Sequence, residues 1–264
     1  MSKEEIINNK TFEALCKSVR SGLRLWSSNN LVEILKIVLF FNVPATSIMV
    51  QSVLHLLKKE INDLNISEII FLHMLCSKTR NEPSIKAIQI ALPIVFEANI
   101  KLKLDREDMG HVAEALDYSS SYKVSEATFD YLITVVSKLQ FDDIRDAFKV
   151  ARACSQFPLP HPLKGSVCVS ALDFLLDNGF TAKYSEADVH HILESVTKNV
   201  RRDDSFYHER FFNTIVDLVI QKDTGSYKAI MTCRRLLRAV RSLLSNKVNV
   251  LINLCYRILQ EKIC

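Results

Sequence analysis

The chain has 264 residues, of which 48% are hydrophobic and 24% charged, and its formal net charge is +4. This composition excludes an intrinsically disordered chain, and the length suits either two ordinary domains or one elongated array. Only five Gly and six Pro are present, where average usage would give roughly eighteen and thirteen. Few turns can therefore need a positive φ, which argues against hairpin-rich β architecture and favours helices joined by short loops.

A helical cap is expected over residues 1–30. The first ten residues, MSKEEIINNK, are polar and differ from both a secretory signal and an Arg-rich transit peptide. A helix is expected from Thr11 to Trp26, and Trp26, the only tryptophan of the chain, is expected to pack against neighbouring helices. The strongly apolar stretch Ile34–Leu57 follows. Because Asn-Val-Pro in its middle is a helix stop, we expect two helices with a tight turn there rather than a membrane span.

Five segments share a pattern in which an acidic residue directly precedes an aliphatic one, with apolar residues three and seven positions further on. The pairs are Glu33-Ile34, Glu68-Ile69, Asp108-Met109, Asp143-Ile144 and Asp188-Val189. Their spacings are 35, 40, 35 and 45 residues, and the offsets place the apolar side chains on one helix face. Each acid is expected in the first helical turn, where its charge complements the helix dipole. The expected N-caps are Asn65 or Ser67, Asp105 and Ser185.

A second apolar helix is expected after each anchor. The expected segments are Ser47–Glu60, Ser84–Leu102, Ser125–Leu139, Leu163–Leu176 and Phe206–Ile220. A period of roughly 35–45 residues with two helices is typical of an α-solenoid, in which each hairpin buries the apolar face of its neighbour. The predicted fold is therefore all-α, a single array over residues 1–264. It would hold about five hairpin repeats in 31–224, followed by a basic hairpin in 225–264 formed by Tyr227–Leu244 and Asn246–Glu261.

The sequence carries no recognised catalytic or metal motif. Its five glycines stand alone, so there is no Gly-rich phosphate loop, and GxSxG and HExxH are absent. The seven cysteines form no CxxC pair and lie among apolar neighbours, as reduced core thiols do. His190 and His191 would point about 100° apart on a helix, which favours a solvated surface over a shared metal ion. The stretch FPLPHPLKG is expected to be a rigid loop between repeats, with a ligand for a Pro-binding domain as the alternative. We expect neither enzyme activity nor a cofactor.

Positive charge is concentrated at the C-terminal end of the sequence. The last forty residues hold eight Lys and Arg against one acidic residue, a net charge of +7, so the preceding 224 residues sum to −3. Within MTCRRLLRAVRSLL, Arg234, Arg238 and Arg241 share one helix face, and Arg235 lies at its flank. Like charges at this spacing repel, and an anionic partner removes the repulsion. Because guanidinium groups suit phosphates and stack on bases, these four arginines are candidate RNA contacts. A solvated face, or one paired with acids of the neighbouring hairpin, is the alternative.

Two stretches, SGLRLWSSNNLVEILKIVLFFNVPATSIMVQSVLHLL and LNISEIIFLHMLCSKTRNEP, combine Leu/Ile-rich helices with little Gly and small polar turns. In this respect, over roughly residues 20–220, the chain resembles the helical-repeat region of the FAST kinase domain-containing family. The resemblance implies a mitochondrial RNA-binding protein acting in transcript processing, stability or translation, without kinase activity. That family normally continues into a C-terminal α/β module similar to a nuclease fold, whereas nothing strand-like follows residue 244 here. The resemblance thus implies the helical part of a longer protein or a truncated product.

The expected function is that of a non-catalytic protein that binds single-stranded RNA through Arg234, Arg235, Arg238 and Arg241, with other proteins as further partners. The resemblance implies a mitochondrial location; without it, the chain would be expected in the cytoplasm. The alternative is a scaffold for protein–protein interaction that binds no nucleic acid, which the slightly acidic first 224 residues fit better. The direction of the arginine side chains discriminates between the two, because pairing of Arg234, Arg238 and Arg241 with acids of the previous hairpin would favour the scaffold.

Overall fold

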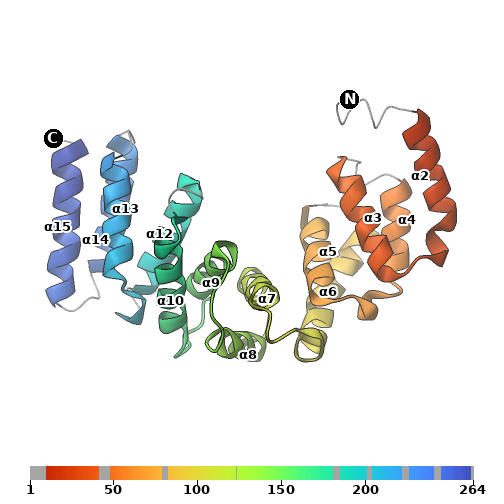
Figure 1. The fold of residues 1–264 in the computed structure, drawn as a ribbon, viewed down its shortest axis with the longest axis horizontal. Helices are drawn as coiled ribbons and strands as arrows, with labels where there is room; N and C mark the ends of the chain where they lie inside the picture. Colours follow the sequence, from red (N-terminus) through yellow and green to blue (C-terminus); the bar gives the residue numbers. More distant parts are fainter. Residues whose placement is uncertain are drawn as a thin grey trace. The chain divides into compact units, whose positions relative to one another are not determined.

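The computed structural model describes residues 10–41, 48–78, 83–122, 124–180, 185–200, 204–221, 226–240 and 245–262. Within these ranges the protein is all-helical, and no residue lies in a β-strand (Figure 1). The expected all-α class is therefore confirmed. By its internal contacts the chain divides into two compact units, Met1–Leu104 (unit 1) and Asp105–Cys264 (unit 2).

Unit 1 contains α-helices and two short 3₁₀ turns among its described residues. They are α2 (Lys10–Gly22), η1 (Leu23–Leu25), α3 (Ser28–Phe40), α4 (Ile48–Leu57), η2 (Ile61–Asp63), α5 (Ile66–Lys78) and α6 (Pro83–Lys103). The apolar stretch from Ile34 to Leu57 is thus divided between α3 and α4, as expected from its internal helix stop. None of the described helices is long and apolar enough to cross a membrane.

Unit 2 continues the alternation of helices. They are α7 (Met109–Ser121), α8 (Glu126–Val136), α9 (Ile144–Gln156), α10 (Lys164–Asp177), α12 (Glu186–Val200), η3 (Asp204–Phe206), α13 (Glu209–Gln221), α14 (Ser226–Val240) and α15 (Ser245–Lys262). All five helices expected after the anchors are present, as α4, α6, α8, α10 and α13, with ends within about three residues of the expected ones. The two helices expected after residue 225 are α14 and α15.

The acidic anchors occupy three different positions relative to the starts of their helices. Glu68 lies in the first turn of α5, where its Oε2 accepts from the backbone N–H of Asn65 and the Asn65 side chain accepts from the Glu68 N–H, both at 2.9 Å. This reciprocal pair is a capping box. Ser185 also caps its helix, α12, because its Oγ accepts from the Asp188 N–H at 3.3 Å; the same hydroxyl donates to the Asp188 carboxylate at 2.6 Å. Asn65 and Ser185 are therefore confirmed as N-caps.

The other anchors depart from the expectation. Asp108 and Asp143 are themselves N-caps, since their side chains accept from the backbone N–H groups of His111 at 3.2 Å and Arg145 at 2.7 Å. Asp105, the expected N-cap of α7, instead accepts from the Glu107 N–H in the turn before the helix. Glu33 lies in the middle of α3. A carboxylate satisfies the free N–H groups from the N-cap position as well as from the first turn, so spacing alone could not separate these positions.

Contacts within unit 2 follow two series. The first helices of successive pairs pack on one another in the order α7, α9, α12, α14, and the second helices in the order α8, α10, α13, α15. Within pairs, α7 packs on α8, α9 on α10, α12 on α13 and α14 on α15. The residues at these contacts are apolar and almost fully buried, among them Val112, Leu116, Ile192, Val196 and Leu236, each exposed by 0%. The positions three and seven residues after the aliphatic member of each acidic–aliphatic pair are thus core positions in α7 and α12.

Unit 1 shows the same alternation on a smaller scale. The contacts are α3 with α4, α5 with α6, α3 with α5 and α2 with α4. Its core includes Leu31, Leu35, Val53, Ile69 and Leu72, all exposed by 1% or less. Trp26 is half-buried just after η1, and its backbone N–H donates to the Leu23 carbonyl at 3.3 Å.

The Pro-rich stretch forms the loop between α9 and α10, and a buried lysine closes it. Lys164 is exposed by only 3%. Its Nζ donates to the carbonyls of Phe157 at 2.7 Å and Leu159 at 2.9 Å, and it lies over the rings of Phe157 and Phe206. The Phe157 ring in turn stacks on Phe129 of α8. The stretch therefore joins the two helices of one pair, and not successive repeats as expected. Its contacts leave Lys164 unavailable to a ligand.

Candidate functional site

The arginines singled out from the sequence lie on α14, whose two sides differ sharply. One side is buried and carries Ala229, Thr232, Cys233, Leu236 and Ala239. The other side is exposed and carries Tyr227, Ile230, Arg234, Leu237 and Arg238. At about 100° per residue these five exposed positions fall within one sector of the helix, here called the α14 exposed face.

Arg234 and Arg238 are one helical turn apart on this face. Both are exposed, and neither forms an ion pair with any part of the chain that the structure describes. Arg241, the third member expected on this face, lies outside the described residues. The pairing that would have favoured a scaffold is therefore not seen for Arg234 and Arg238.

Arg235 points the other way, towards α12 of the preceding helix pair. Its side chain is exposed by 17%, its Nη2 lies 3.6 Å from Glu194 Oε2, and its Nη1 donates to His190 Nδ1 at 3.3 Å. The neighbouring position in sequence thus carries an arginine with a structural partner. Among the three described arginines of the four expected to contact RNA, Arg235 is the one that contacts a neighbouring helix.

The carboxylate of Glu194 on α12 lies close to two cationic side chains, Lys198 and Arg235. Lys198 Nζ lies 3.4 Å from Glu194 Oε1, on the opposite side from Arg235. Partial desolvation raises the pKa of Glu194. The charge and the hydrogen bond of Lys198 and the charges of Arg235 and His191 lower it by more, so the pKa of Glu194 is below its ordinary value. Glu194 is therefore ionised at neutral pH and neutralises part of the local positive charge, which leaves Arg234 and Arg238 as the unbalanced cations of this face.

Large apolar side chains accompany these arginines, a feature that the sequence analysis missed. Tyr227, Ile230 and Leu237 are exposed by 72%, 49% and 48%. The signal was present in the sequence, because 227, 230, 234 and 237 follow the same helical spacing as the arginines. It was overlooked because an apolar residue on a helix is ordinarily read as core. A face with both guanidinium and aromatic groups can bind phosphates and stack on flat rings.

The adjacent histidines on α12 have separate partners. His190 accepts from Arg235, whereas His191 Nε2 is hydrogen-bonded to Gln156 Nε2 of α9 at 2.6 Å. The two rings therefore serve two different helix contacts, in line with the expected divergence of neighbouring positions. Over the described residues no group of three or more His, Cys, Asp or Glu side chains is placed to hold a metal ion.

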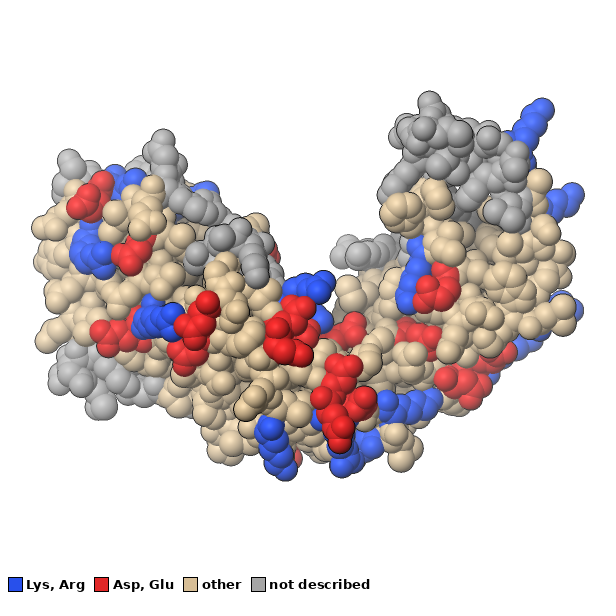
Figure 2. Space-filling view, viewed as in Figure 1, with Lys and Arg blue, Asp and Glu red and all other residues tan. Residues whose placement is uncertain are grey.

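An acidic pocket of about 590 Å³ lies elsewhere in unit 2, between the start of α7 and the start of α9. Its acidic lining residues are Asp105, Glu107, Asp108, Asp142, Asp143 and Asp146. Figure 2 shows Lys and Arg side chains interleaved with Asp and Glu on the visible face of unit 2, without a wide field of positive charge. A polyanion would be repelled at the pocket, so phosphate contacts are more favourable on α14.

Comparison of the chain with protein-family models, with curated proteins and with solved structures finds no match. The features of the chain that bear on its function are the α14 exposed face and the contacts between helix pairs.

Proposed function

We propose that this chain is a non-catalytic RNA-binding protein built as an α-solenoid of helical hairpins. The solenoid is supported by the pattern of helix–helix contacts in unit 2. The first helix of each pair packs on the first helix of the next pair, and the second helix packs on the second. Such arrays bind ligands over the surfaces that stacking creates, rather than in an enclosed active site. The absence of catalytic motifs in the sequence supports a binding role.

The observation that carries the RNA proposal is the pair Arg234 and Arg238. Two exposed arginines one turn apart, without ion pairs to described residues, repel each other by a few tenths of a kcal/mol. A phosphate bound between them relieves that repulsion, and each planar guanidinium offers two parallel donors to it. Tyr227, exposed two helical turns before Arg234 on the same face, supplies a ring on which an unpaired base can stack. Single-stranded RNA provides both a phosphate and a free base, whereas a duplex hides its bases.

The resemblance to the helical-repeat region of the FAST kinase domain-containing family supports the same proposal. That family consists of mitochondrial proteins that act in RNA processing, stability or translation, and a mitochondrial location is proposed for this chain on that resemblance alone. No phosphoryl-transfer role is proposed, because the chain has no Gly-rich phosphate loop.

A salt titration of binding to a single-stranded oligoribonucleotide tests this proposal. On a single strand each phosphate contact contributes about 0.7 to the slope of log K against log salt. The double variant R234A/R238A should therefore flatten the slope by about 1.4 and weaken binding at low salt. The matched control is R257A, which removes one arginine from the same helix pair; Arg257 already pairs with Asp217 at 2.7 Å. Its slope should stay within about 0.7 of the parent value.

Equal slopes for the parent chain and R234A/R238A would overturn the assignment to α14. Absence of binding to the oligoribonucleotide at about 50 mM salt, where electrostatic contacts are strong, would overturn RNA binding altogether.

The second candidate is a protein–protein scaffold, and one observation favours it. Ile230 and Leu237 are about half exposed on α14, and apolar side chains at this helical spacing are typical of a face that receives a partner helix. Their replacement by serine separates the two functions. I230S/L237S should leave the salt slope of RNA binding unchanged if phosphates are the main contact, and it should abolish binding of a protein partner.

A further inference from the structure

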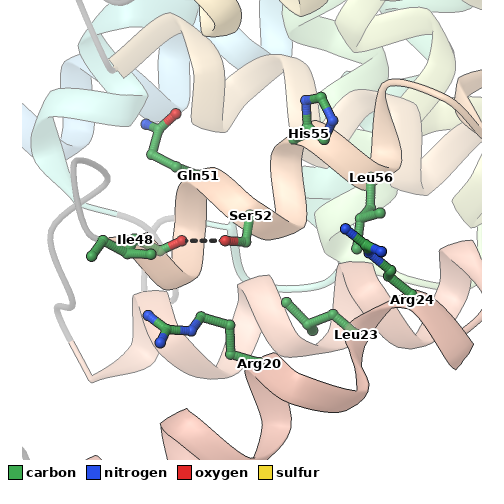
Figure 3. A pocket seen from close by; sticks show the side chains of 8 residues that line it. All are labelled: Arg20, Leu23, Arg24, Ile48, Gln51, Ser52, His55 and Leu56. Atoms are coloured by element: carbon green, nitrogen blue, oxygen red, sulfur yellow. Dashed lines mark hydrogen bonds between the residues drawn. The ribbon is translucent and has the colours of Figure 1, made fainter.

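A groove of about 560 Å³ in unit 1 has the composition of an anion site, independently of α14. One wall is formed by α2 and η1, with Arg20, Leu23 and Arg24 (Figure 3). The other wall is formed by α4, with Ile48, Gln51, Ser52, His55 and Leu56. This volume lies in the range of sites for small molecules. We call it the α2–α4 groove.

Among the residues that the structure describes, the polar lining of the groove consists of groups that can donate hydrogen bonds, without a carboxylate. Arg20 and Arg24 are exposed, four residues apart, and form no ion pair within the described part of the chain. Figure 3 shows their side chains on either side of Leu23, with the Arg20 guanidinium turned away from Arg24. Gln51 and His55 lie on α4, and their side chains point away from α2 in this view. The donors that the groove offers an anion are therefore mainly the two guanidinium groups of its α2–η1 wall.

The remaining lining is apolar and open to a ligand. Leu23 is 2% exposed and forms the floor, whereas Ile48 is 69% exposed at the edge of the groove. The Ser52 hydroxyl donates to the Ile48 carbonyl at 2.7 Å, so its proton is already committed. An inorganic anion alone would leave this apolar surface in water. A ligand that joins an anionic group to a flat or aliphatic group would cover both parts.

We propose that the α2–α4 groove binds an organic phosphate monoester of about mononucleotide size. The dianionic phosphate binds at the α2–η1 wall, where the exposed side chains of Arg20 and Arg24 turn towards it, because a doubly charged group satisfies two guanidinium groups better than a carboxylate does. The organic part lies against Leu23, Leu56 and Ile48. This proposal does not rest on RNA binding at α14, since the residues belong to unit 1 and α14 belongs to unit 2.

Trp26 provides a direct readout of this groove. It is the only tryptophan of the chain, and it follows the groove wall by two residues, with its backbone bonded to Leu23. The probe is phenyl phosphate, and its binding is followed by the fluorescence of Trp26. Isothermal titration calorimetry provides an independent measurement of the affinity. We expect saturable binding of phenyl phosphate, weaker binding of inorganic phosphate, and binding weakened by about tenfold for methyl phenyl phosphate, a diester with a single charge.

Variants at exposed positions assign the binding without disturbing the fold. R20Q/R24Q should weaken phenyl phosphate binding by about a hundredfold, or about tenfold for each arginine. K17Q is the matched control, because Lys17 is exposed on the same helix and lies outside the groove. It should bind within about twofold of the parent chain. I48S should weaken phenyl phosphate by about threefold and leave inorganic phosphate unchanged.

Three results would overturn the proposal. One is the lack of a saturable response to phenyl phosphate up to about 10 mM, beyond which affinity is too weak to assign a site. Another is an equal loss of affinity in R20Q/R24Q and K17Q, which would indicate general charge attraction. The third is equal or tighter binding of the diester, which would point to the phosphate backbone of a nucleic acid instead of a free monoester.

Discussion

Arg152 on α9 donates a hydrogen bond from Nε to Oδ1 of Asp117 on α7 at 2.8 Å, and a second from Nη2 to Oδ2 of the same carboxylate. The two residues are 35 positions apart, which is the spacing of the acidic anchors that precede these helices. His208 and Asp173 are joined at 2.9 Å across the same interval. The repeat therefore carries polar links between successive helix pairs as well as apolar faces.

The first prediction concerns the contribution of the Arg152–Asp117 link. The side chains are 34% and 17% exposed, so solvent screens the pair only in part. We expect R152A to lower the free energy of unfolding by about 1–2 kcal/mol, since a bidentate charged hydrogen bond and packing on the Phe148 ring are both lost. Urea unfolding measures the change, and a double-mutant cycle with D117N should give a coupling of about 1 kcal/mol.

The control is Arg145, which pairs with Asp143 only two residues away at the start of the same helix and is 79% exposed. R145A should change the free energy of unfolding by less than about 0.5 kcal/mol. A similar loss in R145A and R152A would mean that the link between helix pairs contributes no more than a local surface pair.

The second prediction concerns the contact of α10 with η3 at Gly165. A Cβ at this position would lie 1.8 Å from Ser205 Oγ and 2.5 Å from Ser205 Cβ. We expect G165A to destabilise the protein by about 1–3 kcal/mol, because the helix must move away from η3. S205G should restore most of that loss by removing both clashing atoms.

Gly179 supplies the matched comparison for this test. Its φ is +72°, and a Cβ there would meet nothing within 4 Å. G179A should cost about 1 kcal/mol through the backbone alone, and S205G should not restore it. Rescue of G179A by S205G, or failure to rescue G165A, would contradict the steric explanation.

The sequence was enough to predict the helices, because their cause is local. Apolar periodicity and polar turns located α4, α6, α8, α10 and α13 to within a few residues. The links between pairs have a different cause. Whether Arg152 or Arg235 faces a neighbouring helix depends on the rotation of that helix in the packed unit, and spacing along one helix does not determine it. For the same reason the sequence grouped Arg235 with Arg234, although the structure separates them onto different sides of α14.

The third prediction concerns buried thiols at high pH. Desolvation raises the pKa of Cys168 to about 12, despite the opposing charge of Lys164. An unfolded thiol loses its proton near pH 8.5–9, so between about pH 9 and 12 the folded chain holds the extra proton. Stability is then fully present below pH 9 and falls as pH rises, by up to about 1.4 kcal/mol per pH unit for this thiol. C168A lacks this dependence, so its stability deficit of about 1–2 kcal/mol at pH 7 should shrink by pH 10.

Urea unfolding of both proteins at pH 7, 9 and 10 provides the measurement. V167A is the control, because Val167 is the buried, non-titrating neighbour on the same helix. Its deficit should stay constant over this range. A deficit of C168A that stays equally constant would mean that the thiol does not remain protonated in the folded state.

The last prediction separates Arg235 from Arg234 by their effects on stability. R235A removes the contacts to Glu194 and His190 and should lower the free energy of unfolding at pH 7 by about 0.5–1 kcal/mol. R234A should leave it within about 0.5 kcal/mol, because Arg234 is exposed and unpaired among the described residues.

The pKa of Glu194 is lowered in the folded state, partly by Arg235. Its contribution is therefore present above the ordinary pKa of a glutamate and is lost as pH falls through the lower folded value. The R235A deficit should accordingly be largest near pH 7 and decrease towards pH 4, as measured by urea midpoints at both values. A larger loss in R234A than in R235A would reverse the roles assigned to these two neighbours.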